Sequence, residues 1–183
     1  MPTYNGTSDI TQFNLKPGQQ AERKLLVTIA EWEEPYGSST VTCREILGTR
    51  TPDSSIDYNA DIETETDIRG NNYTDVTRTQ PQQDLDPYKI LGGSRLGAFL
   101  NQIRRRNDLS ELNVFTVYVV TMYAGTEGQY ETEKHDDCTI TYTSVGGDSR
   151  VSMPISVYLS NKITLGTIDK IAVDFTFSAD SQG

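Results

Sequence analysis

The chain has 183 residues, of which 35% are hydrophobic, and its mean hydropathy is -0.52. This composition is typical of a soluble protein with a core of modest size. Its 26 acidic and 16 basic residues give a net charge of -10, whereas a surface that grips nucleic acid needs clustered Lys and Arg. The sequence shows no charged start followed by an apolar block and no apolar run of about 20 residues, so we expect neither a secretory signal nor a membrane segment.

Reactive side chains are scarce in this sequence. Cys43 and Cys138 lie far apart, each within a predicted strand, which favours buried free thiols in a reducing environment. His135 is the only histidine, and the acids beside it predict an exposed position. Neither a histidine metal cluster nor a catalytic triad is therefore expected. No nucleophile elbow, phosphate-binding loop or calcium loop occurs, so we expect no enzyme activity and no cofactor.

The N-terminal part predicts an arm followed by two strands. Residues 1–20 are polar and predict an extended arm, with a short strand near 10–15. Short apolar runs at 24–30 and 40–47 predict two strands, and residues 35–39 between them are rich in turn formers. Residues 48–55 then predict a loop.

Residues 56–80 predict a long β-hairpin. From Ile56 to Ile68 the even positions are apolar or threonine, and the odd positions are acids or Asn59. A period of two places these two sets on opposite faces of a strand. Residues 70–72 suit a reversal, and a second β-rich run follows until Pro81. The first arm is longer than the usual strand of about five or six residues, so we expect part of it to extend beyond its own sheet.

Two interpretations of this hairpin remain open. It could be an ordinary pair at the edge of a sandwich, with its acids in solvent. Alternatively, it crosses to a neighbouring subunit and its acids face an enclosed space. A metal site is not expected on it, because acids at every second position of a strand stand about 7 Å apart.

The period changes after the polar connector at 82–87. Leu96, Phe99, Leu100 and Ile103 form one stripe of a helix whose N-cap is Ser94. Three arginines occupy the last turn, where cations complement the helix dipole. We interpret this helix-end charge cluster as solvated or facing another subunit; it consists of Arg104, Arg105 and Arg106.

The C-terminal half predicts the remaining strands. Residues 113–123 are dense in β-branched and aromatic side chains, which indicates a central strand buried on both faces. Further strands are predicted at 137–145, 151–159 and 163–177, with a possible kink at Gly166. The pattern predicts a single mainly β (α+β) domain over 1–183: a β-sandwich of two packed antiparallel sheets with one flanking helix and a long protruding hairpin.

The order of these parts resembles the major tail protein, or tail tube protein, of long-tailed bacteriophages. The resemblance runs from about Ile56 to Phe177 and is carried by the segment 67–88 (DIRGNNYTDVTRTQPQQDLDPY), the helix at 96–106, the strand at 114–123 and the block 137–150 (DCTITYTSVGGDSR). Residues 1–55 match less clearly. Membership would imply a structural virion protein, assembled in the host cytoplasm, whose six-membered rings stack into the tube that conducts genomic DNA during ejection.

The resemblance also implies partners. The chain would bind copies of itself and other tail proteins, namely the tape measure, tail terminator and distal tail proteins, while DNA would pass without specific binding and no membrane would be involved. A tube that passes DNA must not hold it, so we expect an acidic lumen, whose repulsion reaches about 8 Å at physiological salt. The candidate lumen residues are Asp57, Asp61, Glu63, Glu65 and Asp67. The candidate inter-subunit residues are Ile62, Thr64, Ile68, Arg69, Tyr73, Val76 and Arg78.

A monomeric sandwich that binds a carbohydrate or protein ligand is the competing class. It would need an exposed aromatic platform, for which Tyr36, Tyr58 and Tyr130 are candidates. Interfaces between subunits use tyrosine equally well, so these residues do not separate the two classes.

Overall fold

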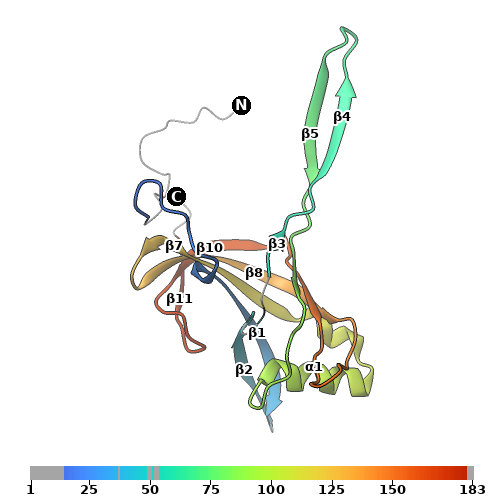
Figure 1. Cartoon of the computed structure of the whole chain (residues 1–183), viewed down its shortest axis with the longest axis vertical. Coiled ribbons are helices and arrows are strands. Elements are labelled where there is room, and N and C mark those ends of the chain that lie inside the picture. Colours follow the sequence, from blue (N-terminus) through green and yellow to red (C-terminus); the bar gives the residue numbers. More distant parts are fainter. Residues whose placement is uncertain (1–14, 37, 49–50, 52–53, 181–183) are drawn as a thin grey trace.

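The computed structural model describes residues 15–36, 38–48, 51 and 54–180. It is mainly β, with one large antiparallel sheet of nine strands, a separate two-stranded sheet and one α-helix (Figure 1). The large sheet has the order β2-β1-β7-β8-β9-β6-β3, and β10 and β11 branch from β8. In chain order the elements are η1 (Arg23–Leu25), β1 (Leu26–Tyr36), β2 (Ser39–Ile46), β3 (Ile56–Asp57), β4 (Asp61–Thr66), β5 (Asn72–Arg78), β6 (Gln82–Leu85), α1 (Arg95–Arg106), η2 (Leu109–Asn113), β7 (Phe115–Thr126), β8 (Gln129–Tyr142), β9 (Ile155–Tyr158), β10 (Ile163–Ile168) and β11 (Phe177–Ala179).

Strand β8 connects the two parts of the large sheet. Its first half pairs with β10, and its second half, from Thr139 onward, pairs with β9. Between the halves, Asp137 has a positive φ of 55°, and the register against β7 shifts between Phe115 and Val117. Such an irregularity bends a strand and lets it pass from one sheet direction to another. The strands therefore form one connected sheet, and they do not divide clearly into the two packed sheets that the sequence predicts.

The larger core lies between the β1–β2–β7 part of the sheet, the β6–β9 part and α1. Trp32, Phe99 and Phe115 are its aromatic centre, with ring centroids 5.8–6.2 Å apart. Offset and edge-on ring contacts of this kind add to the free energy gained by burial. The stripe predicted on the helix is confirmed, because all four of its residues are buried in this core.

A smaller core lies against Tyr118 of β7, where Phe175 and Phe177 pack edge-on or tilted on the ring. The Tyr118 hydroxyl donates to Glu31, and burial with this carboxylate nearby raises the pKa of Tyr118 to about 12. Arg44 bonds Glu31 at 2.5 Å and lies 4.1 Å from the Phe175 ring centroid. These contacts attach the C-terminal segment to the sheet.

Helix α1 begins where the sequence predicts. The Ser94 hydroxyl accepts a hydrogen bond from the Gly97 amide, and Asn107 ends the helix in a left-handed conformation. A further cap comes from β2: the Glu45 carboxylate accepts from the backbone amides of residues 95 and 96, at 2.8 and 3.0 Å, and from the Tyr88 hydroxyl at 2.6 Å. Burial and Glu45 raise the pKa of Tyr88. A carboxylate from the sheet therefore fixes the helix N-terminus, which the local pattern alone does not reveal.

Several predicted strands differ from the observed ones. The run from Ile56 to Ile68 is not one strand, because Asn59 has a φ of 43° and separates β3 from β4. The connector at 82–87 contains β6, which pairs with β3 and β9. Strand β1 continues into the turn predicted at 35–39, β7 extends beyond the strand predicted at 113–123, and the first half of β8 was not predicted. Gly166, where the sequence suggested a kink, pairs with β8 on one side and β11 on the other. Most of the predicted N-terminal arm, including residues 1–14, lies outside the described residues.

Candidate interaction surface on the projecting hairpin

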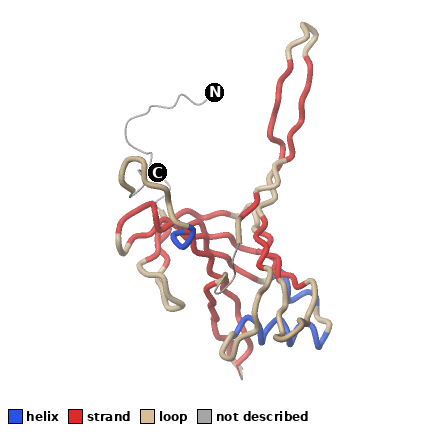
Figure 2. Tube along the Cα trace, viewed as in Figure 1, coloured by secondary structure: helices blue, strands red, loops and turns tan. Residues whose placement is uncertain are grey.

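Strands β4 and β5 form a ribbon that projects from the rest of the molecule and stands apart from the large sheet (Figures 1 and 2). At its neck, the Gln80 amide donates to the Tyr58 carbonyl at 2.9 Å, and the Asn59 side-chain amide donates to the Gln80 carbonyl at 3.2 Å. Burial, and after it the negative charge of Glu133 in β8, raises the pKa of Tyr58. The neck therefore continues from β3 of the large sheet and is closed by its own hydrogen bonds, and the ribbon beyond it projects away.

The turn at the tip is organised by Asp67. Its carboxylate accepts from the backbone amides of Arg69 and Asn71, the Asn71 side chain and the Tyr73 hydroxyl, at 2.8–3.0 Å. Hydrogen bonds to the charged form lower the pKa of Asp67 to about 2. Gly70 has a φ of 81°, a conformation that glycine adopts at little cost. Asp67 therefore has a structural role in shaping the turn.

The register of the ribbon places different chemistry on its two faces. On one face Ile62 is opposite Val76, Thr64 is opposite Thr74, and a third pair near the tip joins Thr66 to Asn72. The threonine hydroxyls of the second pair are 3.4 Å apart, and Thr66 donates to the Asn72 side chain at 2.7 Å. We call this the apolar-threonine face. The predicted alternation is confirmed within β4.

The other face, which we call the acidic face, carries Glu63 opposite Asp75 and Glu65 opposite Tyr73. Like charges directly across a pair of strands destabilise it. Among the described residues, no cation forms an ion pair with Glu63, Glu65 or Asp75. The described part of the chain therefore leaves the negative charge of this face uncompensated.

The apolar side chains of the ribbon are open to solvent. Ile62 is 61% exposed, Val76 is 62% exposed, and Ile68 at the tip is fully exposed. A two-stranded hairpin alone in water is marginally stable at best, and it gains stability when one face packs on another surface. Nothing in the described part of the chain covers this ribbon, which makes it a candidate surface for another molecule.

The predicted lumen residues do not lie on one continuous ladder. Glu63 and Glu65 share the acidic face, and Asp61 lies beside a bulge at the base of the ribbon. Asp57 belongs to β3, near Asp84 of β6 and Asp86, and Asp67 shapes the turn. The sequence prediction missed Asp75, because its position opposite Glu63 depends on the register set by the turn at residues 67–71.

The predicted inter-subunit residues also divide between surfaces. Ile62, Thr64 and Val76 share the apolar-threonine face, whereas Tyr73 lies on the acidic face. Arg69 and Ile68 are at the exposed tip. The backbone of Arg78 pairs with Asp61, and its side chain lies outside the described part of the structure.

The helix-end charge cluster lies in the last turn of α1, and all three arginines are exposed. Arg104 donates to the side chain of Asn101 at 2.9 Å. Arg105 and Arg106 form no ion pair with any described residue. Asn101 and Gln102 adjoin them in a shallow polar depression.

The remaining candidates for chemistry have structural roles. The prediction that His135 is exposed is wrong: it is 2% exposed, and its Nδ1 lies 2.8 Å from the Ser160 carbonyl. Cys43 and Cys138 are free and buried, as predicted, and burial raises the pKa of both thiols. Within the described residues, no group of His, Cys, Asp and Glu could hold a metal ion, and no helix is long and apolar enough to cross a membrane.

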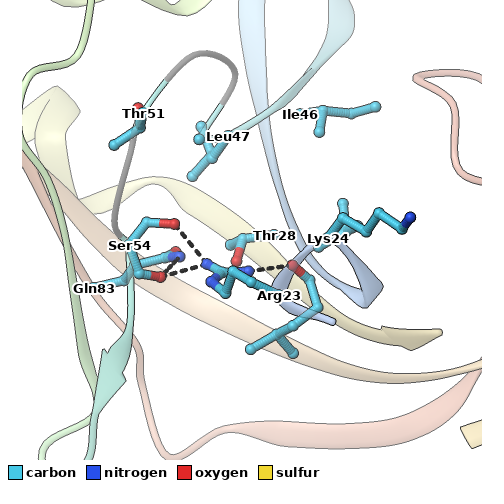
Figure 3. A pocket seen from close by; sticks show the side chains of 11 residues that line it. Arg23, Lys24, Thr28, Ile46, Leu47, Thr51, Ser54 and Gln83 are labelled. Atoms are coloured by element: carbon cyan, nitrogen blue, oxygen red, sulfur yellow. Dashed lines mark hydrogen bonds between the residues drawn. The ribbon is translucent and has the colours of Figure 1, made fainter. Parts of the chain in front are cut away.

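A cavity of about 370 Å³ lies beside η1 (Figure 3). Arg23 and Lys24 line it, and Arg23 donates to the Leu26 carbonyl and to both oxygens of Ser54, each at 2.5 Å. Gln83 also donates to the Ser54 carbonyl, at 2.9 Å. These bonds attach the start of β1 to the segment before β3, so the chain itself already uses the polar groups of Arg23.

Comparisons of the chain with models of protein families, with curated proteins and with solved structures gave no match. The geometry of the chain is therefore the basis for any functional argument. Its most distinctive surface is the projecting ribbon with its two unlike faces.

Proposed function

We propose that this chain is a structural subunit of a bacteriophage tail tube, in which hexameric rings of the protein stack around an acidic lumen that conducts DNA. The observation that carries the proposal is the exposed hairpin with one apolar-threonine face and one acidic face. The connected, bent sheet is consistent with a sandwich-like tail tube fold, in which the two parts of the sheet pack around the larger core.

The two faces suit two different environments. The apolar-threonine face would gain free energy by packing on a neighbouring copy, since exposed Ile and Val are removed from water there. The acidic face would then be directed toward the lumen, where negative charge repels the DNA backbone and prevents tight binding. Such a contact joins unlike patches of successive copies, and heterologous contacts of this kind build rings or stacks.

The uncompensated acids also support this assignment. Glu63 and Asp75 oppose each other with no ion-pair partner among the described residues, at a cost to the hairpin. If this face lines a channel for DNA, repulsion between these acids and the DNA backbone gives a reason for retaining them. In this proposal the protein acts in the virion tail, with other tail proteins at the ends of the tube and the tape measure protein inside it.

The competing class, a monomeric binding module, gains no support from its aromatic candidates. Tyr36 ends β1 and is 71% exposed, whereas Tyr58 lies in the hairpin neck near Glu133. Tyr130 packs against the smaller core. These three side chains therefore have separate environments and do not suggest a shared platform.

The experiment is deletion of residues 61–77 with a short Gly-Ser linker in their place. We expect the variant to keep the thermal unfolding transition of the large sheet and to lose polymerisation, as measured by sedimentation and negative-stain imaging. Intact chain, supplied with tail-initiating components, is the control and should form rings or tubes. Tubes formed by the deletion variant would contradict the role assigned to the hairpin.

A further inference from the structure

We infer that the tip of the hairpin binds a specific groove on a second copy of this chain, the groove between residues 87–91 and 147–152. This inference rests on the proposed function and adds the acceptor surface that the hairpin needs. It also accounts for exposed apolar and basic side chains that the fold itself does not use.

The groove has a volume of about 350 Å³ and an apolar floor. Ile90 is 38% exposed and Val151 is 55% exposed, and Leu91 adjoins them. The two segments that form the groove are joined by backbone bonds: the Ile90 amide donates to the Val151 carbonyl at 3.4 Å, and the Met153 amide donates to the Tyr88 carbonyl at 2.9 Å. The floor is thus attached to the sheet next to the buried Met153, which favours a preformed site.

The charges of the groove and the hairpin are complementary. Lys89 and Arg150 line the groove together with one acid, Asp148, and among the described residues none of the three forms an ion pair. Residues 61–78 of the hairpin carry five acids against two arginines. A positive rim facing a negative ribbon steers association and fixes its orientation.

The chemistry of the tip matches the groove in a second respect. Ile68 is the most exposed large apolar side chain in the described part of the chain, and it has no cover in the isolated molecule. The groove offers Ile90 and Val151 as a floor for it, while Glu65, near the tip, approaches the basic rim and leaves Glu63 and Asp75, farther from the tip, to face the lumen. An apolar anchor surrounded by charged pairs is the usual arrangement of a specific contact.

The positions of the two surfaces allow a head-to-tail contact. In Figure 1 the hairpin forms the upper end of the molecule, and α1, with the loops that adjoin it, lies at the lower end beside the ends of β1 and β2. The groove belongs to that lower end, since residue 91 lies only four residues before α1. A donor at one end and an acceptor at the other repeat indefinitely when copies follow one another along an axis, as a tube requires.

The helix-end charge cluster is the other basic surface. The depression beside it is lined by Ala98, Asn101, Gln102 and two arginines, so it offers no large apolar side chain to Ile68. This depression would attract the acids of the hairpin but would leave the Ile68 side chain exposed to water. The groove is favoured because it satisfies both the charge and the apolar side chain.

The first test uses charge reversal. The variant K89E/R150E places acids opposite the acidic hairpin, and we expect its critical concentration for assembly to rise about 100-fold, since like charges at an interface strongly oppose binding. Adding E65K to the same chain restores an opposite charge at the rim and should recover part of the assembly. The matched control is R105E/R106E, which makes the same change of net charge at the helix end and should assemble like the wild-type chain.

The outcomes separate the inference from the proposed function. If the wild-type chain assembles and K89E/R150E assembles equally well, or if R105E/R106E alone prevents assembly, the groove is not the acceptor and the tail tube proposal stands. If the wild-type chain itself stays monomeric with tail-initiating components present, both are overturned. Thermal unfolding of every variant shows whether it is folded, and recovery by the threefold variant K89E/R150E/E65K excludes misfolding as the cause of the loss.

A second test measures proximity directly. Oxidation of assembled I68C/V151C should give a ladder of covalently linked chains, because a disulfide needs Cα atoms within about 7 Å. The native Cys43 and Cys138 are buried and should not contribute. The control I68C/A98C tests the helix end, where Ala98 is exposed. A ladder with A98C and none with V151C would assign the tip to the helix end and overturn the inference.

Discussion

The paired substitution I62S/V76S should weaken assembly without unfolding the protein. Ile62 and Val76 face each other on the ribbon and are 61% and 62% exposed in the isolated chain, so most of each side chain remains to be buried by a partner. Complete burial of such a side chain contributes about 1.5–3 kcal/mol, which leaves about 1–2 kcal/mol for each at the interface. The pair therefore contributes about 2–4 kcal/mol, equivalent to about a 30-fold to 1,000-fold change in the association constant.

The assay is the concentration at which half of the protein sediments as assembled particles, measured beside thermal unfolding of the unassembled chain. Unfolding should change by less than about 0.5 kcal/mol, because the two side chains are exposed before assembly. The matched control is L109S/V173S, whose side chains are 56% and 54% exposed away from the hairpin. Equal assembly of I62S/V76S and the control would refute the argument that the apolar-threonine face packs on a neighbour.

Three further predictions concern the fold. E45Q should lower the unfolding free energy, measured by urea denaturation, by about 2–4 kcal/mol, because the Glu45 carboxylate accepts charge-assisted hydrogen bonds at the start of α1. The control E33Q, at an exposed site, should change the unfolding free energy little. The low pKa of Asp67 implies that its ionised form stabilises the turn above about pH 4, its usual pKa range, and that this contribution is lost as the pH falls toward 2. Hairpin amides should then exchange faster at pH 2 than at pH 5 after correction for intrinsic rates, and D67N should remove the difference. Cys43 and Cys138 should react with a thiol reagent only on unfolding, since burial raises their pKa and blocks access; rapid labelling of the native chain would contradict this.

The sequence correctly predicted the elements that depend only on residues close together in the chain. The alternation in β4 placed acids on one face, and the register of the ribbon bears this out. The helix stripe and its Ser94 cap also appear as predicted, because an N-cap and a 3.6-residue period are properties of contiguous sequence. The mainly β character with one helix follows from the same signals.

Long-range pairing determined the features that the sequence did not reveal. Residues 129–136 are polar and resemble a loop, yet they form half of β8 because β7 and β10 pair on either side. Gln82–Leu85 likewise becomes a strand through pairing with β3 and β9. His135 is buried because the distant Ser160 carbonyl accepts its hydrogen bond, although its neighbours in sequence are charged. The periodic pattern within one segment carries no information about partners that lie far away in the sequence.

The candidate surface was predicted in part. The hairpin and its acids could be read from the alternation, but the break at Asn59 could not, and this break separates Asp57 from the acidic face. The pairing of Glu63 with Asp75 depends on the turn register. The acceptor groove joins segments about 60 residues apart in sequence, so only the folded chain brings them together.

The most direct test of the account is electron microscopy of the concentrated, purified chain supplied with tail-initiating components. The account predicts six-membered rings stacked into a tube, with Glu63 and Asp75 of each copy directed at an acidic lumen. Solitary particles under these conditions, or a tube whose inner wall is basic, would contradict it.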